Sequence, residues 1–353
     1  MKNIITSVIT TTIVVLIFMI IISNVIKPID PIEKVSETTQ KININEETPK
    51  ITIDTDDEIK VVTSPVVGIA VEKMYANNMI FDNMYSIGSG FIVDSSGYIV
   101  TNHHVIGSAY STVYITLYGG DTVKGTIIWS NKELDLAVIK INVSGLPVME
   151  LGDSKNLKLG ERVVAIGNPL GFEFQRTVTA GIISGLNRSI SIEGSYMEDL
   201  IQTDASINPG NSGGPLVNKN GEAIGINTIK VTSAEGIGFA IPINQIKPII
   251  KKIKETGEFN EIYLGIKGYD KEMISNMNSN IRINKGIYIY DIEKNSPIDK
   301  AEVQIGSIIL SIDNIEVNTL CEMREILFSK NKGETIIVRL ITNDVEHEVE
   351  IEL

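Results

Sequence analysis

Residues 210–214 read Gly210-Asn211-Ser212-Gly213-Gly214, and the segment Gln202–Pro209 leads into them. A serine flanked by glycines is typical of nucleophilic hydrolases, because glycine allows a tight turn and a close approach of backbone N–H groups to the reacting carbonyl oxygen. The five residues alone fit two architectures, the nucleophile elbow of an α/β-hydrolase and the active-site turn of a chymotrypsin-type enzyme. The order of the other candidate groups along the chain distinguishes the two.

The chain has only three histidines, His103, His104 and His347. In an α/β-hydrolase the serine precedes both the acid and the histidine, which would leave only His347, far downstream. By contrast, His103 and His104 follow one strand-like run and Asp135 opens another, which gives the order His, Asp, Ser. A serine hydroxyl needs an imidazole to take its proton, and the imidazole needs a carboxylate to fix its tautomer. The order therefore favours a chymotrypsin-type site over an esterase elbow.

The part of the chain from about Val61 to Ile241 is a series of short β-type runs separated by Gly, Asn, Asp and Ser. No long amphipathic helix is expected between them, so the pattern predicts antiparallel barrels or sandwiches rather than a βαβ fold. The runs lie at 90–93, 98–100, 113–117, 137–141, 162–166, 181–183, 214–217 and 223–226.

Length and composition exclude several classes of protein. A chain of 353 residues with 43% hydrophobic content suits two folded domains plus extensions. The formal net charge of −13 argues against a nucleic-acid partner, which needs a clustered basic surface. Cys321 is the only cysteine, so the chain forms no intramolecular disulfide and no multi-cysteine metal site, and it is expected to be a packed helical residue. A Ser/His/Asp mechanism requires no metal and no organic cofactor.

The N-terminal segment has an uncharged run from Ile4 to Ile26, closed by Lys27. A bilayer core needs about 20 apolar residues in a helix, so residues 1–27 are expected to form a transmembrane anchor. The alternative is a cleaved signal peptide, but its apolar region would be about 7–15 residues long and end in a small-x-small site, which is missing here. Lys2 weakly favours a cytoplasmic N-terminus and an exported body.

Residues 28–60 differ in composition from the segments on either side. They carry three prolines, many Thr and Glu residues, and the acidic cluster Asp54–Glu58. The cluster lacks the mid-loop glycine and the bidentate glutamate of an EF-hand, so it is not expected to bind calcium. We expect this segment to be an acidic flexible linker.

Six motifs in the same order resemble the HtrA (Deg) family of chymotrypsin-fold serine proteases. They are Thr101–Val105, Asp135–Val138, Gly167–Gly171, Gly210–Pro215, Gly225–Thr228 and Gly236–Pro242. The likeness runs from about Val61 to the C-terminus, and the anchor and linker also fit membrane-bound members. The resemblance implies a mainly β chain with a double β-barrel protease domain at 61–257 and a small α+β PDZ domain at 258–353. It also implies a homotrimer, for which no motif here is evidence.

The family triad falls on His104, Asp135 and Ser212. The motif Thr-Asn-x-His-Val selects His104 over His103, and because side chains alternate along a strand, only one of the two is expected to face the cleft. His103 is therefore expected to be exposed. Gly210, Asn211 and Ser212 are expected to form the oxyanion hole, with the N–H groups of Gly210 and Ser212 as donors.

The resemblance also places a P1 pocket, which is lined by Ser206, Ile226, Asn227 and Thr228. Ser206 stands six residues before Ser212, where a trypsin-like enzyme has an aspartate. Without a buried carboxylate, a basic P1 side chain would lack a charge partner. We therefore expect a preference for small or medium aliphatic P1 residues. Segments 186–199, 206–211 and 229–235 match the loops by which family enzymes are switched.

The C-terminal part begins after Ile243–Ile253, where apolar residues recur at helical spacing, with Gly257 as the expected stop. Strands are predicted at 286–290, 307–312 and 335–340, and a helix at Leu320–Ser329. The residues Tyr263-Leu264-Gly265-Ile266 resemble the carboxylate-binding loop of a PDZ domain, although four such residues could equally be a core strand. A PDZ domain adds a peptide C-terminus to its sheet as an extra strand.

Two residues depart from the PDZ pattern. Glu302 and Ser307 stand where family members usually have a glycine and an aspartate, and Glu302 would alter the backbone if its φ is positive. The fold is expected to survive, but peptide binding becomes doubtful.

The expected function is that of a single-pass membrane endopeptidase that cleaves misfolded or exposed polypeptides outside the cytoplasm, with the PDZ domain sensing or gating. The alternative is a PDZ-bearing binding or chaperone module whose protease domain no longer cuts.

Overall fold

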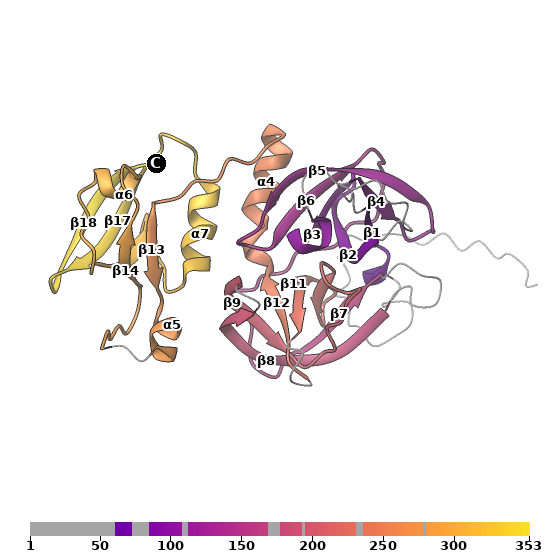
Figure 1. Cartoon of the computed structure of the whole chain (residues 1–353), viewed down its shortest axis with the longest axis horizontal. Helices are drawn as coiled ribbons and strands as arrows, with labels where there is room; N and C mark the ends of the chain where they lie inside the picture. Colours follow the sequence, from indigo (N-terminus) through magenta and orange to yellow (C-terminus); the bar gives the residue numbers. More distant parts are fainter. Residues whose placement is uncertain are drawn as a thin grey trace, which may run out of the picture. The chain divides into compact units, whose positions relative to one another are not determined.

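The strands alternate with turns along most of the chain, as the sequence predicts, and close into two barrels and one further sheet (Figure 1). The computed structural model describes residues 61–72, 85–107, 112–168, 177–192, 195–230, 236–277 and 280–353. All of them belong to one compact unit. The predicted anchor and linker lie outside the described residues, and within these ranges no helix is long and apolar enough to span a bilayer.

The first barrel has six antiparallel strands in the order β1-β2-β3-β6-β5-β4, and β1 pairs with β4 to close it. β-branched residues such as Ile69, Ile99 and Ile139 fill its interior, because they suit the pleated, buried face of a strand. The short helix α3 (His103–Ile106) follows β3. The strands are β1 (Val66–Glu72), β2 (Tyr85–Asp94), β3 (Tyr98–Thr101), β4 (Val113–Thr116), β5 (Thr122–Asn131) and β6 (Leu136–Ile141).

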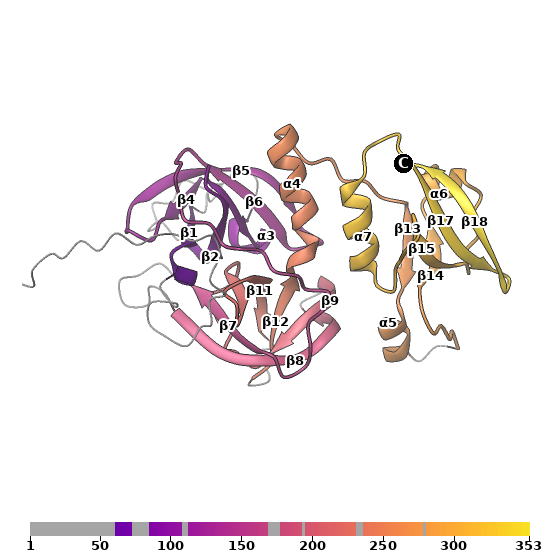
Figure 2. The same ribbon diagram turned by 180° about the vertical axis from the view of Figure 1, so that it is seen from behind.

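The second barrel has the order β10-β11-β12-β9-β8-β7 and is closed by the pairing of β10 with β7. Figure 2 labels β7, β8, β9, β11 and β12 of this barrel. Together the two barrels confirm the predicted chymotrypsin-like double β-barrel. Its strands are β7 (Arg162–Gly167), β8 (Thr177–Ile192), β9 (Ser195–Thr203), β10 (Pro215–Asn218), β11 (Ala223–Lys230) and β12 (Gly238–Pro242).

A helical segment follows the second barrel. The helix expected from Ile243 is divided into the 3-10 turn η1 (Ile243–Gln245) and α4 (Lys247–Thr256). Gly257 ends α4 as predicted, in the left-handed conformation (φ 84°) that glycine adopts at little cost. The predicted domain boundary after residue 257 falls between α4 and the next strand.

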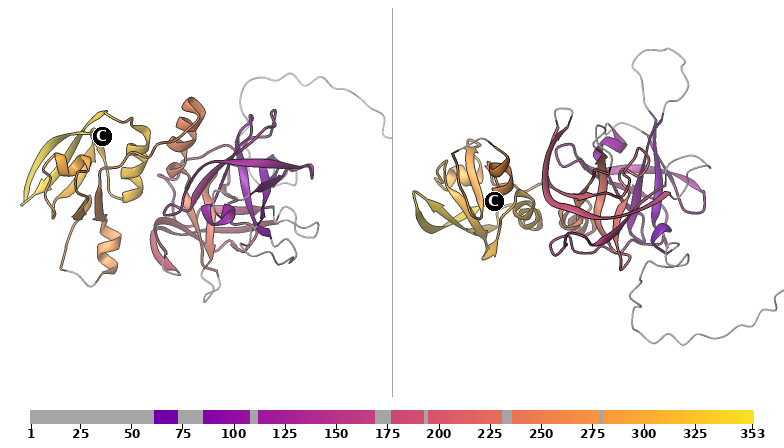
Figure 3. Two further views of the ribbon diagram at one scale, coloured as in Figure 1. Left: turned by 45° about the horizontal axis from the view of Figure 1, so that its top comes forward. Right: turned by 90° about the horizontal axis from the view of Figure 1, so that it is seen from below.

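The C-terminal sheet has the order β13-β14-β15-β17-β18, with β16 paired to β15, and Figure 3 shows it in orange to yellow from two directions. The helix α7 has the predicted bounds, and the Thr319 hydroxyl caps it by accepting from the Glu322 N–H. The elements are β13 (Ile266–Tyr269), α5 (Lys271–Asn276), β14 (Ile287–Ile292), α6 (Pro297–Lys300), β15 (Ile308–Ile312), β16 (Ile315–Glu316), α7 (Leu320–Ser329), β17 (Thr335–Thr342) and β18 (Val345–Glu352).

The helix α7 contacts both the C-terminal sheet and β9. Its residues Leu320, Met323 and Leu327 belong to the core of the C-terminal sheet. On another face, the Cys321 N–H donates to Asp199 Oδ2 (2.8 Å) and Arg324 pairs with Glu198 (2.6 Å). Cys321 is thus the packed helical residue that the sequence predicts, and its burial raises the pKa of the thiol far above its usual range.

The contact at Asp199 predicts a dependence of stability on pH. Burial, and then the negative charge of buried Asp270, raise the pKa of Asp199 from 3.8 to about 7. Folded protein therefore holds a proton that unfolded protein releases above pH 4. Its free energy of unfolding should fall as the pH rises from about 4 to about 7 and then level off. Asp199→Asn, which keeps an oxygen for the Cys321 N–H, should lack this part of the slope in urea titrations. Wild-type and variant curves that run parallel across this range would contradict the assignment.

Glu302 shows the positive φ that the sequence made possible. Its φ is 57°, and its side chain is exposed. Because a left-handed conformation costs an L-residue about 1–2 kcal/mol, Glu302→Gly should raise the free energy of unfolding by about 1 kcal/mol. Glu350→Gly is the matched control, an exposed glutamate in β18, and it should lower stability by about 0.5–1 kcal/mol. Equal effects of both substitutions in denaturant unfolding would argue against strain at Glu302.

Candidate active site

Asp135 lies in the turn between β5 and β6 and is 8% exposed, with a φ of 52°. Its carboxylate accepts from the His104 N–H (2.9 Å) and the Thr228 hydroxyl (2.7 Å), and it contacts His104 Nδ1 at 2.8 Å. The Asn102 side chain donates to the Asp135 carbonyl oxygen (3.0 Å) and so restrains the turn that carries Asp135. With Nδ1 bound to a carboxylate, the imidazole presents Nε2 as the nitrogen that can accept a proton.

His103 and His104 lie on the short helix α3 rather than on a strand, which corrects the expectation based on strand alternation. In a helix, neighbouring side chains point about 100° apart, so only one of the two reaches Asp135. That one is His104, whose side chain is 46% exposed. The expectation that His103 is exposed was wrong: it is partly buried, and this burial lowers its pKa.

Ser212 is oriented by two backbone hydrogen bonds and by its hydroxyl. The hydroxyl donates to the Thr228 carbonyl oxygen (3.0 Å), the Ser212 carbonyl accepts from the Ser89 N–H (2.8 Å), and the next N–H, of Gly213, donates to the Asn227 carbonyl (2.7 Å). Thr228 therefore contacts the carboxylate through its side chain and the serine through its backbone. The sequence predicts Thr228 only as a residue of the substrate pocket. Its contacts with Asp135 and Ser212 were missed, because a strand motif does not show which residues a side chain in it will face.

The turn around Ser212 leaves two backbone donors available. No described residue accepts a hydrogen bond from the N–H group of Gly210 or of Ser212. Asn211 differs, because its N–H donates to the Asn208 carbonyl (3.1 Å) and its side chain bonds to the Asn208 N–H and the Ser206 carbonyl (both 2.9 Å). Asn211 thus braces the turn, and its place in the oxyanion hole beside the expected donors of Gly210 and Ser212 stays a prediction.

Two glycines of the motif are required by packing as well as by the turn. A Cβ on Gly213, whose φ is 83°, would lie 2.2 Å from the Ser89 carbonyl oxygen, and one on Gly214 would lie 2.1 Å from the Ile166 carbonyl oxygen. The turn is therefore pressed against strands of both barrels, β2 and β7. This close packing holds the turn that carries Ser212 against both barrels.

The residues predicted to line the P1 pocket do not gather at one surface. Ser206 is exposed, and its carbonyl oxygen accepts from Thr179 (2.9 Å). Ile226 and Asn227 are fully buried, and the Asn227 amide donates to the Pro215 carbonyl (3.0 Å) inside the second barrel. Ile226 packs in a core cluster with residues of both barrels, such as Val100 and Ile166, so neither side chain faces the surface in this structure.

The four residues of the predicted carboxylate-binding loop lead into an edge strand. Tyr263 is exposed, Leu264 is buried, and Gly265 has a φ of 83° with Ser296 too close for a side chain. Ile266 begins β13, which pairs only with β14 among the described strands, so its other edge is open for strand addition. This geometry suits a PDZ groove and excludes the alternative of a central core strand.

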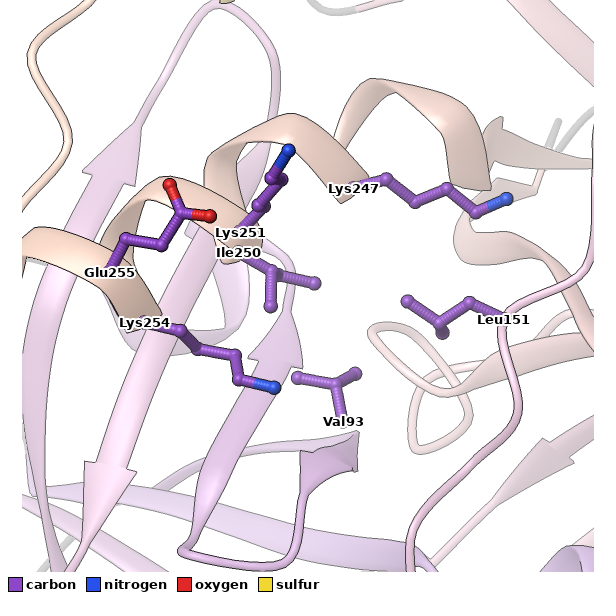
Figure 4. Close-up of a pocket in the computed structure, with 7 residues that line it drawn as sticks. All are labelled: Val93, Leu151, Lys247, Ile250, Lys251, Lys254 and Glu255. Atoms are coloured by element: carbon purple, nitrogen blue, oxygen red, sulfur yellow. The ribbon is translucent and has the colours of Figure 1, made fainter. Parts of the chain in front are cut away.

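A separate pocket of about 320 Å³ lies beside α4, and none of the predicted site residues lines it (Figure 4). Two of its three lysines are already engaged, since Lys247 donates to the Gly152 carbonyl and Lys254 pairs with Asp94 at 2.5 Å. The lining residues are Val93, Leu151, Lys247, Ile250, Lys251, Lys254 and Glu255.

Comparison with known proteins agrees with this geometry. Residues 88–226 match the family described as a trypsin-like peptidase domain, and residues 223–353 match the PDZ domain family. The chain is 37% identical over 323 residues to the serine protease Do-like HtrA of Bacillus subtilis, covering 84% of this chain and 72% of that protein. It is 39% identical to a probable periplasmic serine endoprotease DegP-like of Hahella chejuensis, covering 76% of this chain and 57% of that protein.

A solved structure of the HtrA-type protease AlgW with a tripeptide superposes with a TM-score of 0.63 at 31% identity, covering 83% of this chain and 96% of that one. Domain order, identity and structural likeness thus agree. They show that the chain belongs to the HtrA (Deg) family of serine proteases and is a serine endopeptidase with a trypsin-like peptidase domain followed by a PDZ domain.

Proposed function

We propose that this protein cleaves misfolded or exposed polypeptides through a triad of Ser212, His104 and Asp135. The observation that carries the proposal is the shared contact at Thr228, whose hydroxyl bonds to Asp135 and whose carbonyl bonds to the Ser212 hydroxyl. Asp135 in turn holds the ring of His104. Thr228 thus links Ser212 to the carboxylate that holds His104, which supports assigning the three residues to one site.

The proposed reaction begins when the Ser212 hydroxyl leaves the Thr228 carbonyl and donates to His104 Nε2. As Ser212 Oγ attacks the peptide carbonyl carbon, its proton passes to His104, and Asp135 stabilises the imidazolium that results. The carbonyl oxygen gains the negative charge and accepts from the N–H groups of Gly210 and Ser212. His104 then gives its proton to the leaving amine, and water repeats the sequence to release the acyl group.

The setting of this activity is also part of the proposal. A relative is named a periplasmic endoprotease, and the run Ile4–Ile26 is long enough for an anchor, so we place the catalytic part outside the cytoplasm on a single-pass protein. A homotrimer is proposed from the family resemblance. Peptide C-termini are the proposed ligands of β13, because solved relatives carry peptides and this edge is open.

The P1 preference is expected to be small or medium aliphatic. Ser206 supplies no carboxylate at the position where a trypsin-like enzyme has one, so a basic side chain would lose its hydration without gaining an ion pair. A peptide library digested by the full-length protein and sequenced by mass spectrometry should show Val, Ala, Ile or Leu before most cleavage sites. A profile dominated by Arg or Lys would overturn this expectation.

The proposed triad is tested by labelling with a fluorophosphonate, which reacts only with an activated serine. Full-length protein incubated with unfolded casein should cleave it, and the label should be found on Ser212 by peptide mapping. His104→Ala should abolish both, since the serine then lacks its base. Casein cleavage with the label on another serine would refute the assignment. No cleavage and no label would favour a PDZ-bearing binding module.

A further inference from the structure

Ser89 lies in β2 of the first barrel, is fully buried, and makes four hydrogen bonds. Its hydroxyl donates to the Gly210 carbonyl oxygen (2.5 Å) and accepts from the Asn168 N–H (2.7 Å). Its own N–H donates to the Ser212 carbonyl oxygen (2.8 Å), and its carbonyl accepts from the Thr101 hydroxyl (2.7 Å). One residue thus ties the first barrel to both ends of the turn 210–212.

The hydroxyl of Ser89 acts on the peptide that lies between the two proposed oxyanion donors. The N–H of Gly210 belongs to the peptide before it and the N–H of Ser212 to the peptide after it. Because a peptide unit is planar, a hydrogen bond to the Gly210 carbonyl fixes the orientation of the whole Gly210–Asn211 peptide, to which the two donor peptides are joined. Their directions then depend only on the dihedral angles at Gly210 and Asn211.

The turn needs such a restraint because of the residue at position 210. Gly210 has a φ of 117°, and glycine changes between conformations at little cost. Asn211 is already braced by Asn208 and Ser206, so Gly210 is the hinge of the turn. The Ser89 hydroxyl is the only side-chain donor recorded to the Gly210 carbonyl among the described residues.

We propose that Ser89 is a positioning residue of the oxyanion hole, with its hydroxyl holding the Gly210–Asn211 peptide in the orientation that aims both N–H groups at the developing oxyanion. It does not touch substrate. Asn168, whose N–H donates to the same hydroxyl, fixes the direction of that hydroxyl's proton toward Gly210. The inference rests on the proposed function, since it assigns the part of the site that serves the tetrahedral intermediate.

The test compares Ser89→Ala, Ser89→Cys and a matched control in the full-length protein. Ser307→Ala is the control, because Ser307 is also fully buried and its hydroxyl also makes a short hydrogen bond, 2.7 Å to that of Thr342 in the C-terminal sheet. Removing one oxyanion donor costs about 10²- to 10³-fold in rate, so loosening both through Ser89→Ala should lower kcat by about 10- to 100-fold with little change in KM. Ser89→Cys keeps a similar side-chain shape and a weak donor, so its kcat should lie between those of wild type and Ser89→Ala.

Two further measurements separate positioning from stability. A peptidyl boronic acid forms a tetrahedral adduct on serine, so its affinity for Ser89→Ala should fall together with kcat. The affinity for a substrate peptide, measured in the inactive Ser212→Ala background, should be the same with and without the added Ser89→Ala substitution. Turnover is expressed per active site titrated with fluorophosphonate, which removes any unfolded fraction. Unchanged turnover per titrated site, or equal losses in Ser307→Ala, would overturn the inference.

The outcomes also distinguish this inference from the proposed function. If wild-type protein neither cleaves casein nor labels at Ser212, the proposed function fails first. If wild-type protein is active and Ser89→Ala matches it in kcat and boronate affinity, only the role of Ser89 is refuted. If Ser89→Ala does not fold, the test is made with Ser89→Cys. Unchanged kcat and boronate affinity in Ser89→Cys would contradict the inference, and a joint loss of both would support it.

Discussion

Ser212→Ala should lower the rate of peptide hydrolysis by about 10⁶-fold, to the level of the reaction that the remaining site can support without a nucleophile. The substitution removes one oxygen, and no described neighbour can replace it. The Thr228 hydroxyl is already committed to Asp135, and Ser206 is exposed at the surface. The measurement is kcat on a quenched fluorescent peptide with an aliphatic P1 residue, with casein as a second substrate.

The control for this loss is Ser311→Ala, which removes the same atom from a buried serine in β15. It should keep wild-type kcat. Because triad members act as one unit, His104→Ala should lose nearly as much as Ser212→Ala, and the double variant should lose no more than either alone. Losses that multiply in the double variant, or a residual rate within about 100-fold of wild type, would show that the two residues do not share one mechanism.

The proposed triad could be identified from the sequence because its signal lies in short local segments and in their order. His104, Asp135 and Ser212 each stand in a run whose residue types are demanded by the chemistry, and the β pattern excluded the rival architecture. The barrels were predictable for a similar reason, since alternation and turn residues are local. Strand pairing, as between β1 and β4, was not, because it depends on contacts distant in sequence.

The supporting contacts could not be predicted. The hydroxyl of Ser89 meets a carbonyl 121 residues away, and that of Thr228 meets a carboxylate 93 residues away. A single buried hydroxyl residue produces no periodic pattern in the sequence, so its hydrogen-bond partner can be identified only in the folded structure. The same limit explains Ile226 and Asn227, which a motif places beside the site and the structure places in the core. His103 was misplaced because a four-residue helix is too short for its period to be seen.

Asp135→Asn should lower kcat by about 10⁴-fold while the fold is preserved. Asparagine tolerates the positive φ of this position as well as aspartate does, so the turn should keep its shape. Its oxygen can replace one carboxylate oxygen as an acceptor, and the Thr228 hydroxyl and the His104 N–H both compete for it. The amide nitrogen would then face His104 Nδ1 as a donor. To accept from this amide, Nδ1 of the ring must be unprotonated, so the proton of the neutral imidazole lies on Nε2.

In that tautomer His104 cannot accept the Ser212 proton, and the variant also lacks the negative charge that stabilises an imidazolium. KM should change little, because Asp135 is buried and its carboxylate is already bonded to His104 and Thr228. Fluorophosphonate labelling should slow in proportion to kcat, since both need the same base. Asp313→Asn, which alters a carboxylate bonded to the Ile337 N–H in the C-terminal sheet, is the matched control and should label at the wild-type rate. If Asp135→Asn labelled and cleaved as fast as this control, the carboxylate would be a brace for the His104 backbone and no part of the proton transfer.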